Sequence, residues 1–211
     1  MAKNFAEIAF TLAVKEIQNR LGSRESYARM EKNTFLDGLT LNEINFIANQ
    51  DSFYMASIGE NGFPYIQHRG GPKGFLKILD AKRLGFIDFK GNMQYISVGN
   101  IGGQEKVSII MVDYPSKTRL KLYATAEIIE LKEDPELLNK LILENYKFRP
   151  ERMMVFNLEA YDWNCPQHIT PRYTLEEIDK AFSTQRKYTI KLEEEIKELR
   201  LKLIVNEHKD S

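Results

Sequence analysis

Three short stretches of the chain combine ligand-binding side chains with residues that bend the backbone. The first reads HRGGPKGFLKILD (residues 68–80) and sets His68, Arg69, Lys73 and Lys77 among glycines and a proline. Glycine lets a backbone come close to a ligand, and N–H groups beside Arg and Lys side chains bind phosphate well. The stretch therefore predicts an anion site. A loop with solvated charges is the simpler alternative.

The second stretch, FKGNMQYISVGNIGG (residues 89–103), is dense in glycines and short polar side chains. Its two Gly-Asn pairs, which include Asn92 and Asn100, flank Gln94, Tyr95 and Ser97. Amides and hydroxyls suit a flat heterocycle, because they distinguish its hydrogen-bond donors from its acceptors without a charge. Two successive turns between strands would account for the same composition.

The third stretch, AYDWNCPQHITPRYT (residues 160–174), crowds Trp163, Gln167, His168 and Arg172 into a connection that prolines interrupt. Cys165 and His168 also lie here, but the sequence offers no third group for a thiol nucleophile and too few ligands for a metal. We expect Cys165 to be a buried small hydrophobic residue. We expect His168 to form hydrogen bonds in the wall of a site.

Composition excludes several classes of protein. The 211 residues contain 30 Lys and Arg and 30 Asp and Glu, so no overall field attracts nucleic acid or an anionic membrane. A single cysteine excludes an intrachain disulfide and a Cys-rich zinc site, and the three histidines are widely spaced. The first twenty residues are too interrupted by charge for a signal peptide or a membrane span. We therefore expect a soluble protein of the reducing cytoplasm.

Helices are predicted at several places along the chain. Residues 5–17 have helical apolar spacing, with Gly22 past the end, and Thr40 followed by Glu43 forms a capping box before a second helix. Asp134 and Pro135 begin a helix over DPELLNKLILENY. The segments TLEEIDKAF and KYTIKLEEEIKELRLKLIVNEH are also predicted to be helical.

Strands dominate the middle of the chain. Two β-like runs flank Asn61-Gly62, a strong hairpin signal. Further strands are predicted in FLKILD, RLGFIDF, VSIIMVDY, TRLKLYATAEIIEL and RMMVFNLEAYDW. Short strands without long intervening helices favour an antiparallel sheet that curls into a barrel. We expect helices in residues 1–50 that pack on a barrel in residues 51–173, followed by a helical extension in residues 174–211.

The C-terminal segment contains an apolar seam at Leu192, Ile196, Leu199 and Leu203. This spacing alternates by four and three, as in a coiled coil, but it lasts only about two heptads. Two interpretations remain open. The segment is either a helix that packs on its own barrel or on a partner subunit, or one strand of a true coiled coil.

The order of these stretches resembles the pyridoxamine 5′-phosphate oxidase-like family of FMN-binding split barrels. The resemblance covers residues 40–173, and RGGPKGFLKILD, GNMQYISVGN and WNCPQHI carry it. It implies a mainly β protein with flanking helices (α+β), whose antiparallel, Greek-key-like split barrel binds FMN at the interface of a homodimer. The chain has Gln167-His168-Ile169-Thr170-Pro171-Arg172 where the vitamin B6 oxidase has an Arg-Leu-His-Asp-Arg signature, so oxidation of pyridoxamine phosphate is not expected.

The resemblance also implies residues that hold the cofactor. The phosphate and ribityl chain would lie against Arg69, Lys73 and Lys77. The implied cofactor-binding positions are His68, Arg69, Lys73, Gly74, Phe75, Leu76, Lys77, Asn92, Gln94, Ser97, Asn100, Trp163, Asn164, Gln167, His168 and Arg172. His168 and Arg172 are also the candidates for orienting a substrate or moving a proton.

These features predict an FMN-dependent oxidoreductase that exchanges hydride or electrons with a small molecule. A flavin- or haem-binding protein without turnover would use the same pocket. A scaffold with an empty pocket, whose terminal helices make the useful contacts, is a third interpretation.

Overall fold

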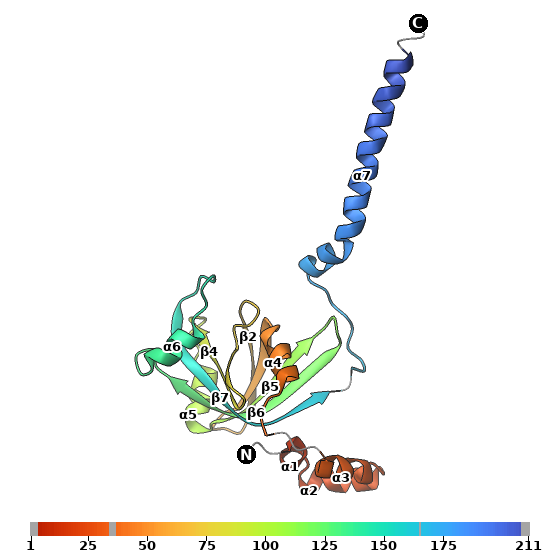
Figure 1. Cartoon of the computed structure of the whole chain (residues 1–211). Helices are drawn as coiled ribbons and strands as arrows, with labels where there is room; N and C mark the ends of the chain where they lie inside the picture. The colour runs from red at the N-terminus through yellow and green to blue at the C-terminus, as the bar shows by residue number, and fades with distance from the viewer. Residues whose placement is uncertain (1–3, 34–36, 165, 208–211) are drawn as a thin grey trace. The chain divides into compact units, whose positions relative to one another are not determined.

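The computed structural model describes residues 4–33, 37–164 and 166–207 (Figure 1). Two compact units divide the chain, residues 1–169 and residues 170–211. The first unit contains the sheet and six of the described helices, and the second contains one long helix.

One antiparallel sheet of seven strands forms the centre of the first unit. Its strands are β1 (Ser52–Ile58), β2 (Pro64–Gly70), β3 (Lys77–Asp80), β4 (Arg83–Phe89), β5 (Lys106–Asp113), β6 (Thr118–Ile129) and β7 (Pro150–Asn164). They lie in the order β2-β1-β5-β6-β7-β4-β3. The sequence-based prediction of a mainly β protein with an antiparallel sheet is confirmed, as is the hairpin, in which Ile58 pairs with Pro64 and Gly62 has a φ of +80°.

The sheet curls until strands far apart in its order meet. Arg69 on β2 and Asp88 on β4 lie 2.6 Å apart (Nη1 to Oδ1), although four other strands separate β2 from β4 in the sheet order. The rings of Phe53 on β1 and Phe86 on β4 also meet, with their centroids 5.5 Å apart. Among the described strands no backbone ladder joins β2 to β3, so the barrel is open rather than closed.

The main core fills the concave side of this sheet. Alternate residues of each strand point to the same face, which places Phe53 and Met55 of β1 beside Phe86 of β4 and Phe156 of β7. Helix α4 (Leu41–Ala48) adds Ile47 to this core, and its predicted capping box between Thr40 and Glu43 is confirmed.

A smaller core lies on the other face of β4 and β7. Ile87 and Met153 pack there against Leu141 of helix α6 (Pro135–Leu141). Asp134 caps this helix by accepting a hydrogen bond from Leu137 N at 2.9 Å, as the sequence predicts. The helix ends at Leu141, before the predicted end at Tyr146.

Residues 89–103 differ from the two turns that composition suggests. Helix α5 (Ile96–Gly103) forms within them, and it buries Ser97 and Ile101. Glycine is a poor helix former, so the sequence alone does not indicate a helix here. Contacts with β1, β2 and β6 supply the stabilisation instead.

The N-terminal segment forms three helices where the sequence predicts one and a polar passage. They are α1 (Phe5–Ala9), α2 (Leu12–Arg20) and α3 (Arg24–Asn33). The chain breaks between α1 and α2 because Thr11 caps α2, accepting a hydrogen bond from Val14 N. Phe5 of α1 stacks on Tyr123 of β6, with the ring centroids 4.7 Å apart, and this stack joins the helices to the sheet.

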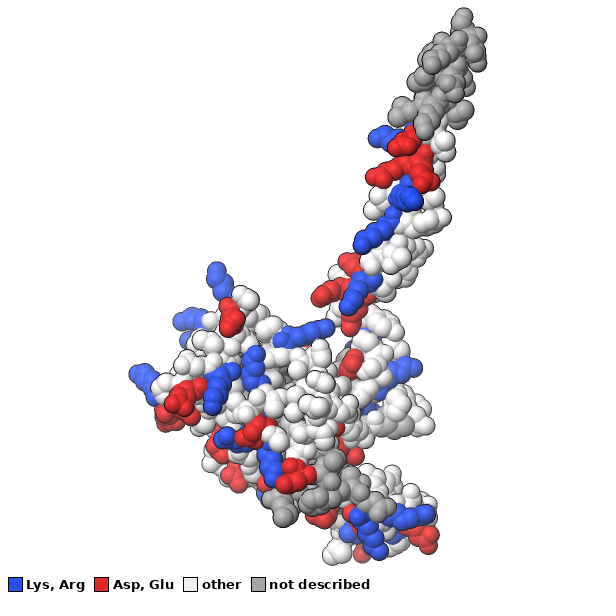
Figure 2. Space-filling model, viewed as in Figure 1, with Lys and Arg blue, Asp and Glu red and all other residues white. Residues whose placement is uncertain are grey.

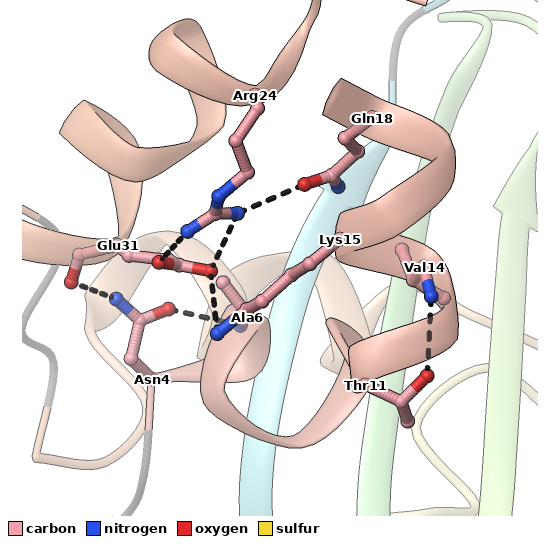
Figure 3. Close-up of polar contacts among 8 residues, drawn as sticks. All are labelled: Asn4, Ala6, Thr11, Val14, Lys15, Gln18, Arg24 and Glu31. Carbon is pink, nitrogen blue, oxygen red and sulfur yellow. Dashed lines mark hydrogen bonds and ion pairs between the residues drawn. The ribbon is translucent and has the colours of Figure 1, made fainter. Parts of the chain in front are cut away.

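A polar network holds the three helices together (Figure 3). Arg24 at the start of α3 donates to Gln18 of α2 at 2.8 Å and forms an ion pair with Glu31. Lys15 of α2 lies 3.5 Å from the same carboxylate, and Asn4 donates to the backbone oxygen of Glu31 at 2.8 Å. These contacts, rather than a large apolar core, define the arrangement of α1, α2 and α3.

The second unit contains helix α7 (Leu175–Glu207). Thr174 and Glu177 form a capping box at its start: Glu177 accepts from Thr174 N at 2.7 Å, and Thr174 accepts from Glu177 N at 3.2 Å. The two helical segments that the sequence predicts form this one helix. Among the described residues, neither α7 nor any other helix has both the length and the apolar composition of a membrane span.

Candidate functional site

A cavity of about 200 Å³ lies where β2, β4, β7 and the start of α5 converge. Its walls come from strand residues and from the connection that leads into α5. The lining side chains include Tyr65, Gln67, Arg69, Asp88, Asn92, Gln94, Tyr95, Ser97, Glu151 and Arg152. The first two of the three stretches singled out in the sequence therefore meet at this cavity.

A buried carboxylate and two guanidinium groups form one wall. Asp88 accepts from Arg69 at 2.6 Å and from Arg152 at 2.9 Å, and it is only 4% exposed. Asp88 and Arg152 are directly opposite each other in the β4–β7 ladder, whereas Arg69 reaches across from β2. Burial lowers the pKa of the Arg69 guanidinium, and the charge of Asp88 partly offsets this effect.

Arg69 has hydrogen-bonding capacity that the described residues do not use. Its Nε is buried and has no hydrogen-bond partner among them. A buried donor without a partner costs free energy, and an anion or a bound water would remove that cost. Arg69 also lines the cavity, so its guanidinium is a candidate for binding an anion there.

The amino end of α5 forms another part of the cavity lining. Ile96, Ser97 and Val98 line the cavity, and the preceding Tyr95 is in the left-handed region with a φ of +54°. No side chain caps this end of the helix. The first N–H groups of a helix have no acceptor within the helix, and they favour an anion.

Tyr95 and Glu151 also line the cavity. The Tyr95 hydroxyl donates to Glu151 at 2.7 Å, and this bond raises the pKa of Tyr95 and lowers that of Glu151. The guanidinium of Arg152 lies 5.1 Å from the centroid of the Tyr95 ring and 3.2 Å from Glu151. Burial alone would lower the pKa of Arg152, but its bonds to Asp88 and Glu151 raise it.

The structure brings together four of the residues that the sequence indicated. Arg69, Asn92, Gln94 and Ser97 all line the cavity. Ser97 donates to Gln67 at 2.6 Å, and Asn92 donates to Gln94 at 3.3 Å. Asn100 lies one turn further along α5 and donates to Ser57 at 3.0 Å, outside the cavity lining.

The lysines and the backbone of the first stretch lie elsewhere. Lys73 is exposed, and Lys77 lines a separate cavity of about 430 Å³ beside α6. The N–H groups of Gly74 and Phe75 donate to backbone oxygens of Gln50 and Pro72, each at 3.0 Å. The side chains of Phe75 and Leu76 belong to the main core.

His68 lies on the opposite face of β2 from the cavity. It alternates with Gln67 and Arg69 along the strand, and its ring meets that of Tyr54 at 5.4 Å between centroids. His68 is exposed on that outward face.

The described residues of the late loop do not line the cavity. Trp163 donates through Nε1 to Glu43 at 2.7 Å, and its ring packs against Phe46 of α4. Asn164 ends β7, and its Oδ1 is buried with no hydrogen-bond partner among the described residues. Gln167 and His168 lie exposed in a turn, and His168 has a φ of +62°.

The remaining positions of that loop are Arg172 and Cys165. Arg172 belongs to the second unit, and it is exposed there. Cys165, which we expect to be a buried small hydrophobic residue, lies outside the described residues. Among the residues that are described, no group of His, Cys, Asp and Glu has the arrangement of a metal site.

Sequence reasoning missed Asp88, Arg152, Glu151 and Gln67. A signal for the first two does exist. Asp88 interrupts the apolar run RLGFIDF, and Arg152 precedes the apolar run MMVF. A charged residue in a strand that is buried on both faces is almost always paired. An ion pair between Asp88 and Arg152 could therefore have been predicted from the sequence.

Comparisons with known proteins give similarities of fold. No protein-family model and no curated protein matches the chain. Among solved structures, HupZ of Group A Streptococcus is 17% identical, with a TM-score of 0.49 over 64% of this chain and 100% of that one. A putative pyridoxamine 5′-phosphate oxidase of Lactobacillus delbrueckii is 24% identical, with a TM-score of 0.47 over 62% of this chain and 96% of that one.

An FMN-binding protein of Syntrophomonas wolfei is also similar. It is 13% identical, with a TM-score of 0.44 over 70% of this chain and 97% of that one.

Proposed function

We propose that this chain is a flavoprotein that binds FMN, with the phosphate in the cavity between Arg69 and the start of α5. The buried Nε of Arg69 carries the proposal, because it is an unused cationic donor beside an uncapped helix end. A phosphate monoester supplies the oxygens that both walls lack. The resemblance in the glycine-rich stretches supports FMN as the source of that phosphate.

The neighbouring side chains have defined tasks in this proposal. Asp88 holds the Arg69 guanidinium in position through the 2.6 Å bond, which leaves Nε for the ligand. Asn92, Gln94 and Ser97 offer amide and hydroxyl groups to the ribityl chain or the ring edge.

The size of the cavity supports a site made by two copies of the chain. Small-molecule sites usually have volumes of about 300–1,000 Å³, whereas this cavity has about 200 Å³. One copy would therefore enclose the phosphate end, and the flavin ring would extend beyond it. Tyr54, Ile58, Phe63 and Ile66 of the β1–β2 hairpin are exposed apolar residues, and they support a separate homodimer contact on the face of the sheet that points away from the cavity.

We further propose an oxidoreductase role. FMN, when bound, would supply hydride or electron transfer, while the protein binds the substrate and excludes water. His168 and Arg172 stay the proposed groups for orienting an anionic substrate or holding a proton. Stopped-flow mixing with NADH or NADPH tests this role. Reduction supports turnover, and no reduction by any physiological donor would favour a flavin- or haem-binding protein without turnover.

Titration with FMN, followed by quenching of flavin fluorescence, tests the binding site. Replacement of Arg69 by Ala should weaken binding by about 1.5–3 kcal/mol, the usual value of a hydrogen bond to a charged group. Lys73→Ala, an exposed cation of the same stretch, should bind FMN as the unchanged chain does. Arg69→Lys keeps the charge next to Asp88 and checks that the loss is not unfolding. Equal affinities for all four proteins would place the phosphate elsewhere.

A further inference from the structure

Helix α7 has a mainly apolar seam along one face. Because the structure joins the two predicted helical segments into one, the spacing by three and four begins at Leu175 and not at Leu192. In heptad notation, the a positions are Leu175, Phe182, Thr189 and Ile196, and the d positions are Ile178, Gln185, Leu192 and Leu199. The seam thus covers about four heptads, the length at which such a pattern becomes a safe sign of a coiled coil.

Within the second unit, the described residues leave the side chains of this seam uncovered. Leu175 is 81% exposed, Phe182 is 52% exposed and Leu199 is 59% exposed. Figure 2 shows Lys, Arg, Asp and Glu side chains interspersed along α7, with uncharged surface between them. A helix of this length with an uncovered apolar stripe is expected to bury it against another helix.

We infer that α7 forms a parallel, two-stranded coiled coil with the α7 helix of a second copy of this chain. One flanking charge pair supports this partner. Glu195, which also lies 3.8 Å from Lys191 of its own helix, is a g position and Arg200 is the e position that follows it, so in a parallel pair each Glu195 faces the other copy's Arg200. In the C-terminal half of the seam, Ile196 at a with Leu192 and Leu199 at d is the combination that favours two strands.

The two polar positions in the seam are compatible with burial. The Thr189 hydroxyl donates to the backbone oxygen of Gln185 at 3.0 Å, so it does not need a partner from the second helix. In register, each Gln185 amide meets the Gln185 amide of the other copy, and each can both donate and accept. Polar layers of this kind fix the register of a coil at some cost in stability.

Disulfide formation in the full chain tests this pairing. In a Cys165→Ser background, Leu192→Cys at a d position should oxidise to a cross-linked dimer about tenfold faster than Lys187→Cys, because only the d position brings two Cβ atoms within disulfide range. Lys187 is an f position on the far side of the helix and is the matched control. Equal rates for the two variants would overturn the proposal, and so would cross-linking of neither.

Charge exchange tests the parallel orientation. Glu195→Arg and Arg200→Glu should each slow cross-linking at position 192 severalfold, because each places like charges opposite one another. The double exchange should restore the rate. Near-ultraviolet circular dichroism of Trp163, which lies in β7 of the first unit, checks that these variants keep their fold. Failure of the double variant to recover would exclude this pairing of the two helices.

Discussion

At the residue scale, Asp88 determines the character of the proposed site. Its carboxylate is buried between two guanidinium groups, one from its cross-strand neighbour Arg152 and one from Arg69. It neutralises charges that could not be buried alone, and it orients Arg69 toward the cavity. Its removal should therefore affect the stability of the barrel as well as binding.

Replacement of Asp88 by Asn should lower the free energy of unfolding by about 3–5 kcal/mol, because it leaves the buried Arg69 without its carboxylate and removes one of the two carboxylates beside Arg152. Asp80→Asn is the matched control, since Asp80 pairs with Arg83 at 2.7 Å on the exposed end of β3. Such surface pairs contribute at most about 1 kcal/mol. Urea denaturation measures both values, and a similar small loss in both variants would contradict this view of Asp88.

Only some residues of the site could be predicted from the sequence, and the reason is physical. Arg69 could be singled out because glycines surround it in the sequence. Its partner Asp88 lies 19 positions away on a strand that does not pair with β2, so only the curl of the sheet brings them together. Local composition contains no information on that long-range contact.

At the element scale, α4 is attached to the sheet through one buried carboxylate. Glu43 accepts from Thr40 N at 2.9 Å within the capping box, from Trp163 at 2.7 Å and from the Tyr161 hydroxyl at 3.1 Å. Burial alone would raise the pKa of Glu43, but these hydrogen bonds outweigh it and lower the pKa. Burial, together with the charge of Glu43, raises the pKa of Tyr161.

The lowered pKa of Glu43 predicts a dependence of stability on pH. The carboxylate stabilises the fold fully above the unfolded value of 4.5, and this contribution is lost as the pH falls through the lower folded pKa. Glu43→Gln should lower stability at pH 7 by about 1.5–3 kcal/mol and flatten its decline below 4.5. Glu16→Gln, on the exposed face of α2, should change neither. Unfolding curves between pH 3 and pH 7 measure this dependence. If Glu43→Gln showed the same decline of the free energy of unfolding with falling pH as the unchanged chain, the prediction would be wrong.

Strands and helix ends were more predictable than α5. The alternation of apolar residues, the Asn61-Gly62 turn and the caps at Thr40 and Asp134 are local signals, and each corresponds to an element of the structure. In α5, by contrast, three of the eight residues are glycines, and its stability comes from the side chains of Ser97 and Ile101 against the sheet. Tertiary contacts override propensity in such a segment.

At the scale of the whole molecule, the exposed apolar residues of the β1–β2 hairpin predict a contact between two copies on the face of the sheet that points away from the cavity. Ile66 is 66% exposed there, so Ile66→Asp should leave the fold intact. If a second copy covers this face, the variant should raise the dissociation constant of the dimer at least about tenfold, since a buried charge costs several kcal/mol at an interface. Leu12→Asp, on α2, is the matched exposed control. Sedimentation velocity measures both variants, and an unchanged dissociation constant for Ile66→Asp would locate the dimer contact elsewhere.

The balance of charge around the cavity determines how strongly the affinity for an anionic ligand depends on ionic strength. Arg69 and Arg152 are matched by Asp88 and Glu151, so the formal sum over these four groups is zero. An approaching dianion would experience little long-range attraction and would be retained by short, directed bonds. Its affinity should therefore hardly change between dilute buffer and physiological ionic strength, unlike that of a site that gathers anions through an excess of positive charge.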